Sequence, residues 1–406
     1  MKSTTPVKEC VGGVTTPRGF KAGGLYCGIR KAKKDIAIIA SQVPATAAGV
    51  FTINKTQAAP VVVDRLQLQH SSVCSALVVN SGNANACTGE RGLNDAWEMA
   101  RSTGQALGIP EEHVLVSSTG VIGQYLPMDK VVAGIRQLAR VLSEAGSRDA
   151  AEAIMTTDTY SKETAVQFSL GKSLVSIGAM AKGSGMIAPN MATMLAFITT
   201  DILITRLLLQ KALTRANSRS FNRITVDGDM STNDMAIVLA NGMAENQPFG
   251  EHSEEFHLFC AGLEYVMIKL AKMIARDGEG ATKLIEIYVK GARTEEEAAQ
   301  AARSVANSNL VKTAIHGCDA NWGRIMAAVG YSGINMDPEQ VEIRFNDLPI
   351  LNKHYEIVLD EEKAKSALAQ EQILLTIDLN QGSQSARFWT CDLTKEYVHI
   401  NASYRS

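Results

Sequence analysis

The segment Lys182-Gly-Ser-Gly-Met-Ile-Ala-Pro-Asn-Met-Ala-Thr-Met-Leu195 lies between two apolar segments with the composition of buried strands. Its two glycines allow positive φ angles and close approach of the backbone to other groups. Pro189 fixes its own φ angle and favours an extended conformation in the residue before it. The small Ala192 then precedes Thr193, after which the chain is apolar. The segment therefore predicts a bent loop that delivers a hydroxyl group at the start of a buried strand.

A second group of small and hydroxyl-bearing residues, Ser117-Ser-Thr-Gly-Val-Ile-Gly123, follows a short predicted strand. Thr119 can offer a hydroxyl, and Gly120 a backbone N–H, to the oxyanion that develops during acyl transfer. Structural explanations serve equally well at this point. A buried Thr193 can simply be hydrogen-bonded to backbone, and hydroxyl side chains commonly stabilise turns. These residues alone are compatible with catalysis but do not establish it.

The remaining chain mixes strand and helix patterns. We predict strands at 35–40, 76–80, 114–117, 174–180, 194–199 and 284–289, and helices at 93–107, 128–145, 204–218 and 360–370. Ser253 is a good N-cap for a further long helix that reaches Arg276 and has one apolar face. Short alternating strands after residue 341 predict some antiparallel sheet near the C-terminus. This order indicates a mixed α/β (α+β) fold, and 406 residues suggest a larger domain with a smaller C-terminal one.

Composition excludes several classes of partner. The chain is 46% hydrophobic, and 40 basic against 42 acidic residues give a net charge of −2. This balance predicts no nucleic-acid partner and no association with an anionic membrane. The N-terminal sequence MKSTTPVKECVGG does not resemble a secretory signal. Seven widely spaced cysteines without a CxxC pair argue against a disulfide framework, so we expect a cytoplasmic protein.

Familiar catalytic and metal motifs are missing from the sequence. It contains neither HExxH nor a Cys/His cluster with zinc spacing, so we expect no metal. The loop Asp277-Gly-Glu-Gly-Ala-Thr-Lys283 does not fit the phosphate-binding pattern GxxxxGK[ST], and no GxSxG elbow occurs. An enzyme with this sequence would therefore need a nucleophile in a less common setting.

Several motifs, in order along nearly the whole chain, resemble those of the glutamate N-acetyltransferases that use N-acetylornithine, the ornithine acetyltransferases. They are Gly12–Phe20, Val79–Ala86, Ser117–Gly123, Lys182–Leu195, Asn222–Asp234, Asp277–Lys283, Cys318–Arg324 and Asn401–Ser406. Several long motifs in the right order are far more specific than one short pattern. The resemblance implies an acyltransferase of arginine biosynthesis with a layered fold of the N-terminal-nucleophile type.

The resemblance also implies that the precursor cleaves itself between Ala192 and Thr193. Residues 1–192 would form an α chain, and residues 193–406 a β chain that begins with the nucleophile. The freed α-amino group, with an unperturbed pKa of about 7.7–8.0, can act as the base for the hydroxyl of its own residue. Thr193 would take the acetyl group from N-acetylornithine and pass it to glutamate, which predicts ping-pong kinetics.

The family's site residues map onto this chain one by one. Thr119 and Gly120 match its oxyanion hole. The substrate-binding positions would be Thr156, Lys182, Thr193, Glu279, Asn401 and Ser406. A lysine can pair with a substrate carboxylate, and a glutamate with an α-ammonium group. The resemblance implies no cofactor and a heterotetramer of two α and two β chains, and it leaves open whether acetyl-CoA is a second donor.

Two other functions fit parts of the same pattern. An N-terminal-nucleophile amidohydrolase or aminopeptidase would use the same threonine chemistry, with water in place of glutamate. A non-catalytic amino-acid-binding protein would keep its chain intact. Acetyl transfer to added glutamate, compared with hydrolysis, separates the first alternative, and an uncut chain would indicate the second.

Overall fold

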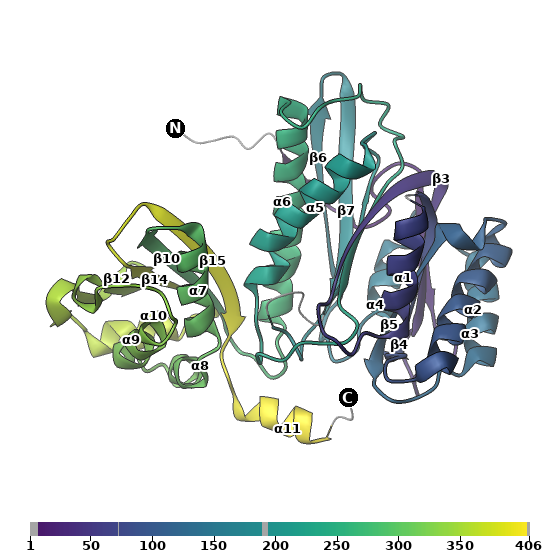
Figure 1. The fold of residues 1–406 in the computed structure, drawn as a ribbon. Helices are drawn as coiled ribbons and strands as arrows, with labels where there is room; N and C mark the ends of the chain where they lie inside the picture. Colours follow the sequence, from purple (N-terminus) through teal and green to yellow (C-terminus); the bar gives the residue numbers. More distant parts are fainter. Residues whose placement is uncertain (1–6, 72, 189–193, 404–406) are drawn as a thin grey trace.

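The computed structural model describes residues 7–71, 73–188 and 194–403, which form a larger and a smaller α/β domain (Figure 1). The larger domain is built on a nine-stranded mixed sheet in the order β1-β6-β7-β8-β9-β3-β4-β5, with β2 paired to β3. Its strands are β1 (Lys8–Cys10), β2 (Phe20–Leu25), β3 (Ile36–Phe51), β4 (Val73–Asn83), β5 (Val114–Val121), β6 (Lys162–Leu170), β7 (Ser173–Lys182), β8 (Leu195–Thr200) and β9 (Met235–Ala240).

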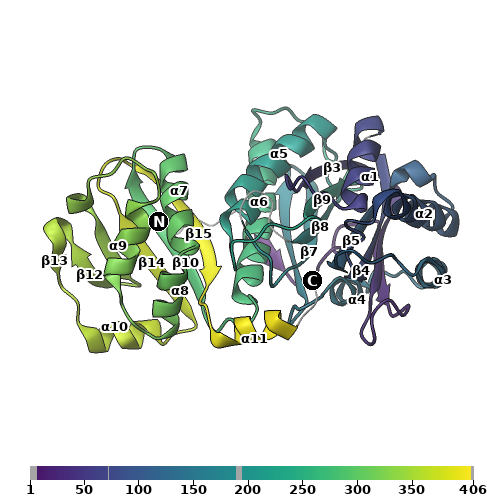
Figure 2. The same cartoon turned by 60° about the horizontal axis from the view of Figure 1, so that its bottom comes forward.

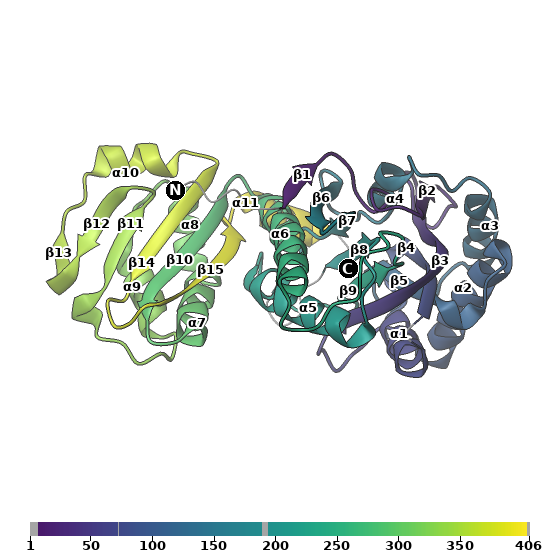
Figure 3. The same cartoon turned by 90° about the horizontal axis from the view of Figure 1, so that it is seen from above.

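Helices cover both faces of this sheet. Helices α5 (Arg206–Arg219) and α6 (Glu254–Arg276) share one apolar core with β6 to β9, and α4 (Ser147–Ala153) packs on the opposite face. Helices α1 (Ala59–His70), α2 (Gly89–Leu107) and α3 (Met128–Ala139) pack near β3, β4 and β5 at the far end. Viewed from above, α6 stands between the large sheet and the small domain (Figure 3).

The smaller domain has a six-stranded sheet in the order β13-β12-β11-β14-β10-β15. Its elements are β10 (Leu284–Ala292), α7 (Glu295–Ala306), α8 (Asn309–His316), α9 (Trp322–Gly330), β11 (Glu342–Phe345), β12 (Leu348–Asn352), β13 (Glu356–Ile357), α10 (Glu361–Leu368), β14 (Gln372–Asp378) and β15 (Gln384–Cys391). The last described helix, α11 (Lys395–Ser403), runs from the small domain back beneath the larger one (Figure 2). The mixed α/β fold with a smaller C-terminal domain is thus confirmed.

Helix α6 shows how local sequence determines an element. The Ser253 hydroxyl accepts a hydrogen bond from the Phe256 N–H at 3.1 Å, which caps the helix as predicted. Phe256, Leu263 and Ile274 are all buried on its inner face. The helix ends at Arg276, so that the next residue, Asp277, begins the loop that leads into the small domain.

One expectation needs correction. The helix predicted at 128–145 ends at Ala139, and a second helix, α4, begins at Ser147. Ser143, which lies between these two helices, exchanges backbone hydrogen bonds of 3.0 and 3.1 Å with Ala22 of β2. This tertiary pairing overrides the local helix propensity. The small sheet contains the antiparallel pairing predicted near the C-terminus, and within it β10 and β14 run parallel.

The predicted cut between residues 192 and 193 falls within the larger domain. Strand β7 ends before this position and β8 begins after it, and the two pair as antiparallel neighbours with Lys182 opposite Leu195. The predicted chains 1–192 and 193–406 would therefore share one sheet. Whether the chain is divided there stays a prediction, because residues 189–193 lie outside the described ones.

A buried charged triad fixes the start of the loop after α6. Lys162 at the start of β6 is fully buried, and its Nζ lies 2.7 Å from Asp158 Oδ1 and 2.5 Å from Asp277 Oδ2. Burial opposes ionisation of Asp158, but the Lys162 and Lys182 ammonium groups hold its pKa below the usual range. Burial likewise opposes the charge of Lys162, yet its two carboxylate partners raise its pKa. Asp158 and Lys162 are therefore both charged at neutral pH.

Replacing the central ammonium should be costly. Lys162→Met keeps the apolar stem but leaves two buried carboxylates without their partner, so we expect the free energy of unfolding to fall by about 3–5 kcal/mol. Urea unfolding followed by circular dichroism measures this. Lys172→Met, in the exposed turn between β6 and β7, is the matched control. Equal stabilities of the two variants would show that the triad does not hold the fold.

Candidate active site

A cavity of about 210 Å³ lies where the ends of β5 and β7 meet the loops around residues 156, 185, 227 and 279, with α11 at one side. Its lining residues are Ala84, Thr119, Gly120, Ile122, Thr156, Thr157, Lys182, Gly185, Met186, Asp227, Asp229, Ser231, Asn233, Glu279, Tyr397 and Asn401. Six predicted site residues are therefore brought together: Thr119, Gly120, Thr156, Lys182, Glu279 and Asn401. The predicted Ala192, Thr193 and Ser406 lie outside the described residues.

The predicted oxyanion residues occupy the end of β5. Gly120 has a φ of +133°, and a Cβ there would lie 2.3 Å from the carbonyl carbon of Gly82 on β4. This close approach of two backbones requires glycine. Asn233 holds the same end of the strand, since its Nδ2 donates to the carbonyls of Ala84 and Ser118 at 2.6 and 2.8 Å.

The charged triad also organises one wall of the cavity. Asp158 Oδ2 accepts the Thr156 N–H at 3.0 Å, and its Oδ1 accepts the Gly183 N–H at 2.7 Å. One buried carboxylate therefore positions the backbone at Thr156 and immediately after Lys182.

Lys182 is the only lysine or arginine among the described residues that line the cavity. Its side chain is 3% exposed and forms no hydrogen bond or ion pair with any residue in the described ranges. Burial lowers the pKa of its ammonium, and Asp158, Asp234 and Glu279 oppose that effect by their charge. A buried ammonium without a close partner suits an anionic ligand, which would supply the missing interaction.

Glu279 faces this lysine from the loop after α6. Its N–H donates to the Ser184 carbonyl at 3.0 Å, and its carboxylate accepts from Asn401 Nδ2 at 2.8 Å. A Cβ on Gly185 would lie 2.3 Å from the Glu279 carboxyl carbon, so glycine at 185 makes room for this carboxylate. Asn401 thereby ties α11 to the cavity.

Asp227 is a site residue that sequence reasoning missed. Its carboxylate accepts the N–H groups of Met186 at 2.6 Å and Ile187 at 2.9 Å, and the Tyr397 hydroxyl at 3.2 Å. Burial raises the pKa of Asp227, and burial together with Asp227 raises the pKa of Tyr397. The motif around residue 227 was the only sequence signal for it. The helix that carries Tyr397 gave none.

Asp234 anchors the other side of the undescribed segment. It is fully buried, and its Oδ1 accepts the Met194 N–H at 3.1 Å. Its second oxygen has no hydrogen-bond partner in the described part of the chain. Burial raises the pKa of Asp234 well above its ordinary value. The backbone is thus fixed by a carboxyl group at Ile187 before the segment and at Met194 after it.

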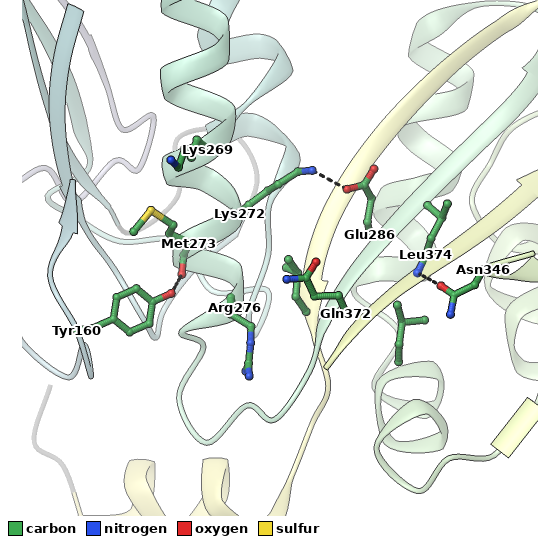
Figure 4. A pocket seen from close by; sticks show the side chains of 11 residues that line it. Tyr160, Lys269, Lys272, Met273, Arg276, Glu286, Asn346, Gln372 and Leu374 are labelled. Atoms are coloured by element: carbon green, nitrogen blue, oxygen red, sulfur yellow. Dashed lines mark hydrogen bonds and ion pairs between the residues drawn. The ribbon is translucent and has the colours of Figure 1, made fainter. Parts of the chain in front are cut away.

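A larger cavity, of about 480 Å³, lies between α6 and the small sheet (Figure 4). None of the six predicted site residues that the structure describes lines it. Its cations already have acidic partners: Lys269 pairs with Glu9, Lys272 with Glu286 at 2.8 Å, and Arg276 with Glu371 at 3.0 Å. The smaller cavity is the better candidate site because it holds a buried lysine that has no hydrogen-bond or ion-pair partner in the described part of the chain.

The described residues contain no cluster of His, Cys, Asp and Glu that could hold a metal ion. Over the same ranges, no helix has the length and apolar character needed to cross a membrane. All seven cysteines are free.

Comparison with known proteins identifies the family. The model of the ArgJ family matches residues 21–406. The arginine biosynthesis bifunctional protein ArgJ of Symbiobacterium thermophilum is 54% identical over 97% of this chain and 99% of its own, and that of Oceanobacillus iheyensis is 51% identical over 99% and 100%. A structure of the Mycobacterium tuberculosis ornithine acetyltransferase complexed with ornithine is 36% identical, covers 45% of this chain and 98% of its own, and has a TM-score of 0.42. The chain therefore belongs to the ArgJ family and is an acetyltransferase of arginine biosynthesis.

Proposed function

We propose that this chain cleaves itself between Ala192 and Thr193 and then transfers an acetyl group from N2-acetylornithine to glutamate through an acetyl ester of Thr193. The observation that carries the proposal is the convergence of Thr119, Lys182 and Glu279 on one cavity from distant parts of the chain. The anchoring of Ile187 and Met194 on either side of the proposed nucleophile supports it further.

Self-cleavage would proceed by two steps that balance. The Thr193 hydroxyl attacks the Ala192 carbonyl carbon, the C–N bond breaks, and the hydroxyl proton ends on the departing amine. Water then hydrolyses the resulting ester, which leaves a carboxylate on Ala192 and frees the Thr193 hydroxyl. The new α-amine, with an unperturbed pKa of about 7.7–8.0, is partly neutral near pH 7 and can accept the hydroxyl proton in later turnovers.

Acetyl transfer would then use the described side chains in separate roles. Lys182 would bind the substrate carboxylate, and Glu279 the α-ammonium group of ornithine or glutamate. Thr119 and the Gly120 N–H would stabilise the oxyanion as the Thr193 oxygen attacks the acetyl carbonyl. Ornithine leaves with a proton on its α-nitrogen, and the glutamate amine attacks the ester to regenerate Thr193.

The relatives support the wider proposal. They are named bifunctional proteins of arginine biosynthesis, and a 36% identical ornithine acetyltransferase contains ornithine. We further propose that acetyl-CoA serves as a second acetyl donor and that the enzyme uses no bound cofactor. We also propose that the two chains remain together as a cytoplasmic heterotetramer, with Thr156 and Asn401 on different chains but in the same site.

The first test concerns the cut. Freshly purified protein should contain two chains by intact mass, with the second beginning Thr-Met-Leu-Ala-Phe, whereas Thr193→Ala should remain one chain because it lacks the attacking hydroxyl. Thr313→Ala, which removes an exposed hydroxyl on α8, should be cut like the wild type. A wild-type chain that stays whole over days would exclude Thr193 as the nucleophile of self-cleavage.

The second test concerns the buried lysine. Lys182→Met removes a charge-assisted interaction with the substrate carboxylate, so we expect kcat/KM for N-acetylornithine to fall about 10- to 100-fold. The assay follows acetyl transfer to glutamate and, separately, hydrolysis without glutamate. An unchanged kcat/KM would exclude a carboxylate contact at Lys182, and hydrolysis without transfer in the wild type would favour an amidohydrolase.

A further inference from the structure

The charged side chains that line the candidate cavity differ in whether they have hydrogen-bond or ion-pair partners. Four line it: Lys182, Asp227, Asp229 and Glu279. Asp227 is engaged by two backbone N–H groups of the 186–187 loop and by Tyr397, and Glu279 accepts from Asn401. Asp229 differs, because its carboxylate forms no hydrogen bond or ion pair within the described ranges and lies exposed at the rim.

The backbone at Asp229 is held by a hydrogen bond, although its carboxylate has no hydrogen-bond or ion-pair partner among the described residues. Its N–H donates to Asp227 Oδ1 at 3.1 Å, and Gly228 between them has a φ of +85°, which completes a tight turn. Asp227 in turn binds the 186–187 loop. The hydrogen bond to Asp227 therefore holds the backbone of Asp229 beside the cavity.

Among the described residues, neither the buried ammonium of Lys182 nor the exposed carboxylate of Asp229 has a hydrogen-bond or ion-pair partner, so the cavity presents two groups of opposite charge. Such a pair matches a small molecule that carries a carboxylate and, separated from it by a flexible chain, a cation. N2-acetylornithine has both, in its α-carboxylate and its δ-ammonium group. Glutamate has a carboxylate at the end of its side chain, where ornithine has the ammonium.

We propose that Asp229 is a specificity-determining residue that attracts the side-chain ammonium of the acetyl donor and repels the side-chain carboxylate of the acceptor. This inference rests on the proposed function, because it assumes that the two amino acids occupy one cavity in turn. Asp229 would thereby favour entry of the ornithine derivative and release of the glutamate derivative once it has formed.

The test compares Asp229→Asn with the wild type in each half-reaction. In a ping-pong scheme, kcat/KM for each substrate reports its own half-reaction. We expect kcat/KM for N-acetylornithine to fall about five-fold and kcat/KM for glutamate to rise about five-fold, as the loss of one solvated charge contact implies. Both effects should shrink at high salt, because the carboxylate is exposed.

Matched controls separate this role from a structural one. Asp347→Asn removes an exposed carboxylate in the turn between β11 and β12, away from the cavity, and should shift neither value. Asp229→Glu keeps the charge and should stay closer to the wild type. With N2-acetylnorvaline, a donor that lacks the δ-ammonium, the fall caused by Asp229→Asn should disappear.

The outcomes also distinguish the two proposals. Opposite shifts in the two values support the role of Asp229. Shifts in the same direction, or none, would overturn it while leaving acetyl transfer intact. A wild-type protein that transfers no acetyl group from N-acetylornithine to glutamate would overturn the proposed function itself.

Discussion

The candidate site depends on the ion triad of Asp158, Lys162 and Asp277, which is buried inside the larger domain. Charged groups removed from water are stable in such a place only when they have partners. Asp158 extends the triad to the backbone of Thr156 and Gly183, so the wall of the cavity next to Lys182 is fixed by the same carboxylate. The triad therefore couples the stability of the sheet to the geometry of the site.

Asp277 also fixes the position of the opposite wall of the cavity, which carries Glu279. Its carboxylate binds Lys162 and the backbone N–H of Thr159, and its carbonyl accepts from Ser184 Oγ at 2.6 Å. Glu279, two residues later, then hydrogen-bonds Ser184 through its N–H and reaches Asn401 with its carboxylate. The end of α6 thus sets the position of Glu279, and Glu279 helps to hold α11 against the cavity.

Local sequence was sufficient where local interactions decide the structure. The cap at Ser253 and the apolar face after it predicted α6 to its last residue. The helix expected at 128–145 was too long, because the pairing of Ser143 with Ala22 is a contact across more than a hundred residues. The mixed α/β order and the small C-terminal domain could likewise be predicted, whereas the parallel pairing of β10 and β14 could not.

The candidate site, like the fold, could be predicted only in part from the sequence. Spacing alone gave no reason to join Thr119, Lys182 and Glu279, and only the family resemblance grouped residues that the fold brings to one cavity. Asp227 and Tyr397 were missed because their hydrogen bond spans 170 positions and neither belongs to a motif that specifies its partner. Sequence alone could not show that Lys182 and Asp229 lack hydrogen-bond and ion-pair partners among the described residues, because this depends on contacts between distant parts of the chain.

The most direct measurement is intact-mass analysis of the protein mixed with N-acetylornithine and quenched with acid before glutamate is added. If Thr193 carries the acetyl group, the chain that begins with it gains the mass of one acetyl group, fragmentation locates this mass on that first residue, and glutamate removes it. An acetyl group on another residue, or none on a protein that still transfers acetyl to glutamate, would exclude Thr193 as the acetyl carrier.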